Sequence, residues 1–282
     1  SMEKKCYRFA RVEKYEGGIG VFATRQIHVG ELILSEAPIV TATLDTVDAR
    51  VAALDDKARR QFYSLCDWRA TPGKKTAVGI FQSNGYPCGD EAGVHFAFSR
   101  VNHSCAPNAT HAYRDGVRYV FACRLIEEGD EVATNYVDLF STRAERRKAL
   151  KDHFGFDCRC LACDSPPDTV VASDARRTRL AALDDEIFDY VRRGRYDAAA
   201  IKVDERLALL RDERLDAPAT LVRTCYDAYQ AMDHKGDAAA AAQWLARVLH
   251  SSRLCEPPDS PDLVDLQKKL SALSTTISKR SK

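Results

Sequence analysis

Three of the ten cysteines crowd into six residues, Cys158, Cys160 and Cys163, whereas the other seven are far apart. This C-x-C-x-x-C spacing supplies three thiolates, and structural zinc normally takes four ligands. We expect Cys105 to be the fourth ligand, because the remaining cysteines stand alone in apolar or helical contexts, where cysteine behaves as a small core residue. Those six are Cys6, Cys66, Cys88, Cys123, Cys225 and Cys255. The spacing therefore predicts a structural zinc site rather than a chance grouping.

The predicted fourth ligand belongs to a second polar cluster, Asn102-His103-Ser104-Cys105, which is followed by Pro107 and Asn108. A lone histidine in an apolar neighbourhood is usually a hydrogen-bonded core residue. A run of Asn, His, Ser and Cys is more specific than that. By itself the cluster leaves a functional and a structural interpretation open.

Two further segments have residue types that could meet a ligand. The glycine-rich turn Glu16-Gly17-Gly18-Ile19-Gly20 lacks Cβ atoms, so a ligand could approach the backbone N–H and C=O groups closely. Taken alone, the turn is more typical of a plain β-turn. The other segment, 131–138, begins as an apolar strand that ends at Tyr136.

Short strands separated by glycine turns are expected to position these segments. Residues 6–43 and 93–140 are rich in Val, Ile, Phe and Tyr between turns spaced about ten residues apart, which favours a small-strand β architecture over a doubly wound sheet. The clearest predicted strands are 31–35, 117–123 and 131–136.

The segment between these two zones has a helical texture. Apolar residues recur at helical spacing from Thr46 to Trp68, which predicts one or two helices inserted into the β domain. Residues 71–75 contain Pro72 and Gly73 and are predicted to be the exit loop.

From Ser141 onward the pattern is helical. Thr142 and Glu145 form a capping box that predicts a helix over 142–154, and the double proline within 165–168 predicts a linker. About five amphipathic helices follow; their expected ranges are 174–193, 196–214, 218–233, 237–254 and 260–277. Two of them open alike after Gly194 and Gly236, which fits either tetratricopeptide-like helix pairs or an ordinary bundle.

The composition excludes several classes of protein. A hydrophobic fraction of 45% with 29% charged residues argues against wholesale disorder, and a net charge of +1 argues against strong non-specific nucleic-acid binding. No apolar run approaches the roughly 18 residues that span a bilayer, and the first twenty residues show no signal-peptide core. We therefore expect an intracellular protein with reduced thiols, some of which bind metal.

The order of these motifs resembles SET-domain protein-lysine methyltransferases. Gly-x-Gly followed by Phe-Ala, then Asn-His-Ser-Cys, a strand ending in Tyr, and C-x-C-x-x-C are similar above all to the SET-and-MYND (SMYD) branch and to related fungal-type SET proteins. The resemblance is specific over 6–164 and only architectural over 165–282. The MYND zinc module needs seven cysteines and a histidine, and 44–92 offers only Cys66 and Cys88, so we expect it to be absent.

The resemblance implies an α+β fold with five parts. The SET core, in which the Asn-His-Ser-Cys segment and the strand to Tyr136 pass each other as a pseudoknot, is expected in two pieces. The expected parts are 6–43 and 93–140 for the SET core, 44–92 for a helical insert, 141–164 for a post-SET zinc segment and 165–282 for a tetratricopeptide-like helical domain.

The resemblance also implies roles for single residues. S-adenosylmethionine is the implied cofactor, with Tyr136 at the methyl-transfer site. Its implied binding residues are Gly17, Gly18, Ile19, Ser99, Asn102, His103, Tyr136 and Phe156. Phe98 and Phe154 are implied to line the lysine channel; the SMYD branch commonly has Tyr at the place of Phe154.

The predicted function is therefore methyl transfer to the ε-amine of lysine in a protein, either a histone or a non-histone protein. The enzyme is expected to be a monomer in the nucleus or cytoplasm, with zinc in a structural role. Two alternatives remain: a cofactor-binding SET scaffold that serves mainly as an interaction module, and a SET enzyme that acts on a small molecule. Intact Asn102, His103 and Tyr136 count against the first, and nothing in the sequence favours the second.

Overall fold

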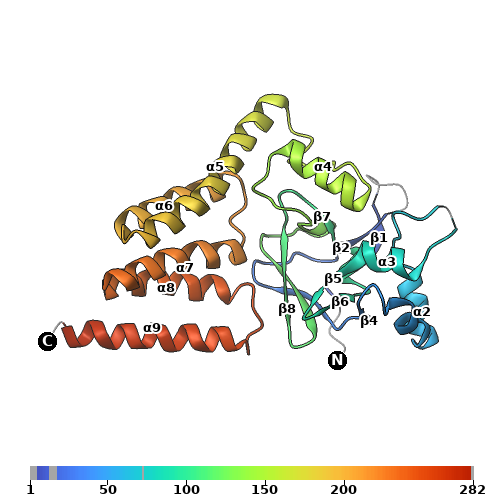
Figure 1. Ribbon diagram of the computed structural model, residues 1–282, viewed down its shortest axis with the longest axis horizontal. Coiled ribbons are helices and arrows are strands. Elements are labelled where there is room, and N and C mark those ends of the chain that lie inside the picture. Colours follow the sequence, from blue (N-terminus) through green and yellow to red (C-terminus); the bar gives the residue numbers. More distant parts are fainter. Residues whose placement is uncertain (1–4, 13–17, 72, 281–282) are drawn as a thin grey trace. The chain divides into compact units, whose positions relative to one another are not determined.

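The computed structural model describes residues 5–12, 18–71 and 73–280, with the side chain of residue 280 excluded (Figure 1). The chain divides into two compact units. The β unit comprises residues 1–137 and 147–159, and the helical unit comprises 138–146 and 160–282. An α+β fold with a helical C-terminal region is confirmed.

Within the described residues, three small sheets build the β unit. The first contains β1 (Tyr7–Arg11), β2 (Ile19–Ala23), β10 (Glu131–Thr134) and β7 (Asn102–His103), in that order. The second contains β3 (Leu32–Glu36), β9 (Val117–Ala122) and β8 (Ala109–Arg114), and the third contains β4 (Val40–Ala42), β6 (Glu91–Val94) and β5 (Gly85–Cys88). The predicted architecture of many short strands is thus confirmed.

Strand β10 lies between segments that are far apart in the sequence. It pairs antiparallel with β2 through Val132 and Val21, and parallel with β7 through Ala133 and Asn102. The Asn108 side chain donates to Glu131 O at 2.9 Å and accepts from Ala133 N–H at 2.8 Å. The Asn102–Cys105 segment is therefore held beside the strand that leads to Tyr136.

The predicted strand 131–136 is two residues too long, because β10 ends at Thr134. Beyond it, the N–H of Tyr136 donates to a histidine side chain, Nδ1 of His103, instead of to a neighbouring strand. At the end of β10, Ser104 N–H donates to Thr134 O at 2.8 Å.

Three helices lie between β4 and β5: α1 (Val47–Ala52), α2 (Asp56–Tyr63) and α3 (Ala77–Asn84). The first two match the predicted insert, whereas α3 was not predicted. Thr76 caps α3 by accepting from Gly79 N–H at 2.9 Å. Because its buried residues surround most of the helix, α3 lacks the polar face that reveals an amphipathic helix in a sequence.

The capping box predicted at Thr142 is present. Helix α4 spans Arg143–Phe154, and the N–H and hydroxyl of Thr142 both donate to Glu145 Oε2, at 2.8 and 2.7 Å. Helix α5 (Pro167–Arg192) starts seven residues before its predicted start. Pro167 occupies its first turn, where proline costs no hydrogen bond, so the predicted linker 165–168 is partly helix.

Helices α6 (Tyr196–Asp212), α7 (Pro218–Lys235), α8 (Ala238–Ser252) and α9 (Pro261–Arg280) complete the helical unit. Each packs against the next along the chain (Figure 1). Gly194 and Gly236 follow α5 and α7 with φ of 69° and 79°, a left-handed conformation that suits glycine. The two similar openings thus mark the turns of two helix pairs, whereas the tetratricopeptide-type assignment stays a prediction.

None of the helices within the described ranges is long and apolar enough to cross a lipid bilayer.

Candidate functional site

A cavity of about 470 Å³ lies in the β unit. All of the implied cofactor residues that the structure describes line it, together with Phe154: Gly18, Ile19, Ser99, Asn102, His103, Tyr136 and Phe156. Gly17 lies outside the described residues. Segments separated by more than a hundred residues therefore meet at one hollow.

His103 links the cavity to Cys105. Its Nδ1 accepts from Tyr136 N–H at 3.0 Å, so the proton of a neutral ring resides on Nε2. Nε2 lies 3.2 Å from Cys105 Sγ and donates to it in this tautomer. The ring is 6% exposed, and its centroid lies 6.4 Å from that of Phe156.

Tyr136 is held by both its backbone and its hydroxyl. The hydroxyl donates to Val101 O at 2.7 Å, and the ring centroid lies 5.0 Å from that of Phe154. With its proton committed to a carbonyl, the phenol oxygen retains lone pairs that can accept a hydrogen bond from another molecule.

Asn102 connects three segments. Its Nδ2 donates to Glu131 Oε1 at 2.7 Å and to Ile19 O at 3.4 Å. Gly20 is needed at this junction, because a Cβ atom there would lie 2.7 Å from Glu131 Oε1. The amide of Asn102 thus ties the glycine-rich strand to β10 at the edge of the cavity.

Ser99 is positioned by the partly buried carboxylate of Glu36. It lies in the 3₁₀ helix η1 (Phe98–Arg100), and Glu36 accepts from the N–H groups at the start of that helix, including Phe98 N at 2.7 Å. The Ser99 hydroxyl is itself buried and has no hydrogen-bond partner among the described residues. An unpartnered buried hydroxyl at a cavity wall points to a bound molecule that supplies the partner.

The sequence analysis missed part of the cavity wall. The missed residues are Ser64, Leu65, Cys66, Asp67, Trp68, Lys75, Arg100 and Gly155. Trp68 Nε1 is also buried without a partner in the described part of the chain. Gly155, with φ of 76°, allows the chain before Phe156 to approach Trp68, since a Cβ atom would lie 2.4 Å from the indole. No spacing in the sequence relates Trp68 to Gly155.

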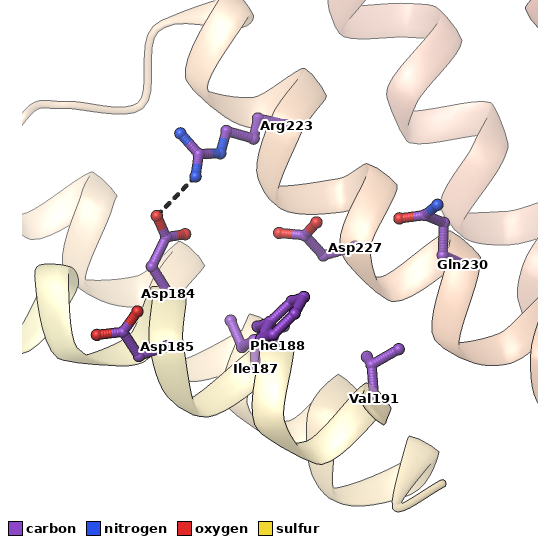
Figure 2. Close-up of a pocket in the computed structure, with 8 residues that line it drawn as sticks. All are labelled: Asp184, Asp185, Ile187, Phe188, Val191, Arg223, Asp227 and Gln230. Atoms are coloured by element: carbon purple, nitrogen blue, oxygen red, sulfur yellow. Dashed lines mark hydrogen bonds and ion pairs between the residues drawn. The ribbon is translucent and has the colours of Figure 1, made fainter. Parts of the chain in front are cut away.

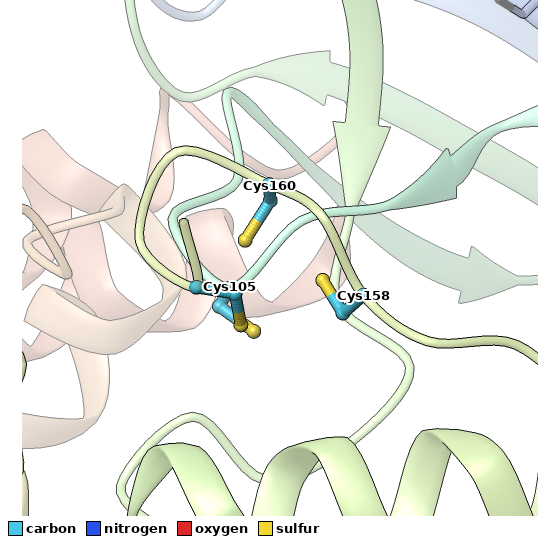
Figure 3. Close-up of side chains that lie close together, drawn as sticks. Cys105, Cys158 and Cys160 are labelled. Carbon is cyan, nitrogen blue, oxygen red and sulfur yellow. The ribbon is translucent and has the colours of Figure 1, made fainter. Parts of the chain in front are cut away.

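The four cysteines predicted to bind metal come together. The sulfur atoms of Cys105, Cys158, Cys160 and Cys163 all lie within 4.8 Å of one another, and all four residues are buried. Figure 3 shows three of these sulfurs turned toward a common space. Four buried thiols in this arrangement form a candidate metal centre.

Comparison with known proteins agrees with this geometry. The family model described as SET domain matches residues 18–137, which contain both the glycine-rich strand and Tyr136. Residues 18–137 are a SET domain.

Three curated relatives are similar to part of this chain. The chain is 34% identical over 175 residues to histone-lysine N-methyltransferase set5 of Schizosaccharomyces pombe, covering 59% of this chain and 54% of set5. It is 29% identical to mouse N-lysine methyltransferase SMYD2 (54% of this chain, 35% of SMYD2) and 37% identical to mouse histone-lysine N-methyltransferase SMYD3 (26% and 17%). The chain thus spans about half the length of set5 and about a third of SMYD2.

A second cavity, of about 390 Å³, adjoins the first within the β unit. The two share Ser99, Tyr136 and Phe154 as wall residues. The wall of the second cavity also includes Tyr86, whose pKa is raised to about 12 by burial. Two adjoining hollows that share Tyr136 suit a reaction between two bound molecules.

Phe98 was implied to line the lysine channel, but it is among the lining residues of neither cavity. It is fully buried in the core of the SET domain, with its ring 4.6 Å from Tyr86 and 4.9 Å from His111. Phe98 and Ser99 both lie in η1, where Phe98 is buried in the core and Ser99 lines both cavities.

The helical unit has a smaller cavity, of about 280 Å³, between α5 and α7. Arg223 NH2 donates to Asp184 Oδ2 there at 2.7 Å. Figure 2 shows the two side chains facing each other. Burial raises the pKa of Asp227, which also lines it. None of the residues that the sequence implicated in chemistry lies in this cavity.

Proposed function

We propose that this chain is an S-adenosylmethionine-dependent enzyme that transfers methyl groups to the ε-amine of lysine in a protein. The observation that carries the proposal is the pair of cavities in the β unit that meet at Tyr136. The names of set5, SMYD2 and SMYD3 support lysine as the acceptor. We further propose a histone or non-histone protein substrate in the nucleus or cytoplasm.

The first cavity fits the proposed cofactor. Its volume falls within the range of about 300–1,000 Å³ that is common for small-molecule sites. Phe156 and His103 provide aromatic surface for the adenine. The buried Ser99 hydroxyl and Trp68 N–H have no hydrogen-bond partner among the described residues, so the cofactor could supply one. Asn102 and the backbone at Gly18 and Ile19 provide polar groups for the amino-acid end.

When bound, the cofactor supplies an electrophilic methyl group. This chain must then hold the substrate lysine as a neutral amine in line with that methyl group. Free lysine has a pKa near 10.4, so the neutral amine is scarce at pH 7. The aromatic rings of Phe154, Tyr136 and Tyr86 at the second cavity disfavour the charged form by desolvation. The Tyr136 oxygen, anchored on Val101 O, can accept from the amine and orient it.

Zinc fits the four-cysteine centre. A tetrahedral ion with Zn–S bonds of about 2.3 Å requires sulfurs about 3.8 Å apart, and the four sulfurs lie within 4.8 Å of each other. A set of four cysteines with no open position is typical of structural zinc. We therefore propose a structural zinc that secures the segment leading from Phe156 to Cys163.

The experiment is methyl transfer from radiolabelled S-adenosylmethionine to cell-lysate proteins and to an array of lysine-containing peptides, followed by mass spectrometry of labelled products. We expect label on lysine side chains, at a rate lower by about 100-fold or more with the Tyr136→Phe variant. Label confined to small molecules would replace the protein substrate by a small one. Absence of transfer together with tight cofactor binding would favour an interaction module.

A further inference from the structure

Positive side chains outnumber negative ones on the described wall of the first cavity. Its described wall contains two permanent cations, Lys75 and Arg100, and one carboxylate, Asp67. The amino-acid end of the proposed cofactor carries a carboxylate as well as an amino group. A carboxylate leaving water needs a cation or several N–H donors to compensate for lost hydration. Lys75 and Arg100 are the two described cations that could compensate for this loss.

Arg100 is already committed to the protein. It is 7% exposed, and its guanidinium lies 4.1 Å above the Phe96 ring. Its NH1 donates to Phe96 O, and its NH2 donates to the Ser64 hydroxyl at 2.8 Å. Burial lowers the pKa of Arg100, partly offset by nearby Glu36. We assign Arg100 to the support of η1 and of the loop that contains Ser64.

Lys75 is held differently. Its ammonium donates to Leu65 O at 2.6 Å and to Tyr63 O at 3.3 Å, at the carboxyl end of α2. Carbonyls at a helix end favour a cation, so they keep the ammonium at the cavity wall. None of the ion pairs in the described residues involves Lys75, and an ammonium has three N–H donors.

Asp67 does not neutralise this ammonium by direct contact. Its carboxylate accepts instead from Thr76 N–H at 3.1 Å and from Arg69 N–H at 3.3 Å. These bonds close the loop that brings Lys75 back toward the end of α2. Asp67 thereby stabilises the loop while leaving the Lys75 charge available to a ligand.

We propose that Lys75 binds the carboxylate of the cofactor's amino-acid end, an inference that rests on the function proposed above. The ammonium is held in place by Leu65 O and Tyr63 O before the ligand arrives, so little side-chain entropy is lost on binding. Lys75 lies on the helical insert, and cofactor recognition thus extends beyond the glycine-rich strand and the Asn102–His103 pair.

The test compares two ligands that differ only in the carboxylate. S-adenosylhomocysteine carries it, and its decarboxylated analogue, S-adenosyl-3-thiopropylamine, does not. Calorimetry on the full chain should show that Lys75→Met weakens binding of S-adenosylhomocysteine about ten-fold or more and changes binding of the analogue less than two-fold, as expected for one charge-assisted hydrogen bond. Lys75→Arg, which keeps the charge, should restore most of the affinity.

The matched control is Lys74→Met, because Lys74 is exposed and is not among the residues that line the cavity. It should bind both ligands as the unaltered chain does. Equal weakening of both ligands by Lys75→Met would make Lys75 a support of the loop alone and overturn the inference. Equal affinity of the unaltered chain for both ligands would also overturn it. Binding of neither ligand by the unaltered chain would instead refute the proposed function.

Discussion

The polar contacts beside the cavities of the β unit differ from those in the core of the helical unit. In the β unit, polar groups join segments that are distant in sequence, as when Asn102 donates to Glu131 and Glu36 accepts from the start of η1. In the helical unit, charges pair with charges: Glu213 accepts from Arg176 and Arg177, and Asp184 accepts from Arg206 and Arg223.

The difference indicates where a ligand could form hydrogen bonds that the protein itself does not make. The β unit leaves the Ser99 hydroxyl and the Trp68 N–H buried and unpartnered at a cavity wall, so a bound molecule can supply the missing hydrogen bonds. The charged groups that line the helical cavity include Asp184 and Arg223, which already pair with each other. We therefore expect a ligand to bind at the cavities of the β unit rather than at the helical cavity.

The largest expected effect is on stability, in the helical unit. Glu213 is 8% exposed and Arg177 is fully buried. Glu213→Gln leaves buried positive charge without its partner, so we expect a loss of about 3–5 kcal/mol in the free energy of unfolding, measured with urea. The control is Asp189→Asn, whose exposed pairs with Arg192 and Arg193 should contribute less than about 1 kcal/mol. Equal losses in both variants would contradict the contrast.

The next effect is on catalysis, in the β unit. Tyr136→Phe removes the hydroxyl that donates to Val101 O and that is proposed to orient the amine. We expect turnover to fall about 100-fold or more, while affinity for S-adenosylhomocysteine stays within a few-fold. Turnover near that of the unaltered chain would exclude the proposed role. The two results together would assign stability to Glu213 and chemistry to Tyr136.

Removal of zinc should affect the cofactor site more than the fold. Phe156 lies two residues before Cys158, so we expect its place beside His103 to depend on the proposed metal centre. Chelation or Cys160→Ser should weaken cofactor binding about ten-fold or more, while far-UV circular dichroism changes little. Cys225→Ser is the control, because Cys225 lies in the helical core. Unchanged affinity after metal loss, or freshly purified protein without zinc, would refute the coupling.

The smallest expected effect is a difference between the two units in the pH at which each loses stability. Burial and nearby Arg118 lower the pKa of His111 to about 4, and Arg118 NH1 donates to its Nδ1. His111 therefore stays neutral when folded but is protonated below about pH 6.5 when unfolded, so stability is lost as pH falls from about 6.5 toward 4. The loss from this group should reach about 1 kcal/mol at pH 5.5.

In the helical unit, hydrogen bonds from Arg179 and Lys202 lower the pKa of Glu205 to about 2. Its contribution is present above about pH 4.5 and is lost only as pH falls toward 2. Acid should therefore affect the β unit first. The fluorescence of Trp68 in a Trp244→Phe variant should change at higher pH than that of Trp244 in a Trp68→Phe variant. The reverse order would contradict the assignment of these groups.

Motifs with strict chemistry were predictable from sequence. The spacing of Cys158, Cys160 and Cys163 indicates a metal centre because few other roles need three thiols so close, and the capping box at Thr142 indicates a helix start because its two bonds are local. The Asn102–His103 pair was placed at the cavity by a resemblance of motif order, and the structure brings the described members of that set together.

Features created by tertiary packing were not predictable. Trp68 and Lys75 reach the cavity only because the loop after α2 folds back, and no periodicity encodes that return. Phe98 and Ser99 are neighbours in the sequence, but within η1 Phe98 is buried in the core whereas Ser99 lines the cavities. Helix α3 was missed because burial on most sides removes the amphipathic pattern.

The most direct test of the account is hydrogen–deuterium exchange of the full chain, with and without saturating S-adenosylhomocysteine. We expect slower exchange in segments 18–23, 64–68, 99–103, 131–137 and 154–156, which line the first cavity or lead to it. Helices α5 to α9 should exchange at the same rate in both samples. Protection confined to α5 and α7 around the helical cavity, or no protection within the SET domain, would contradict the account.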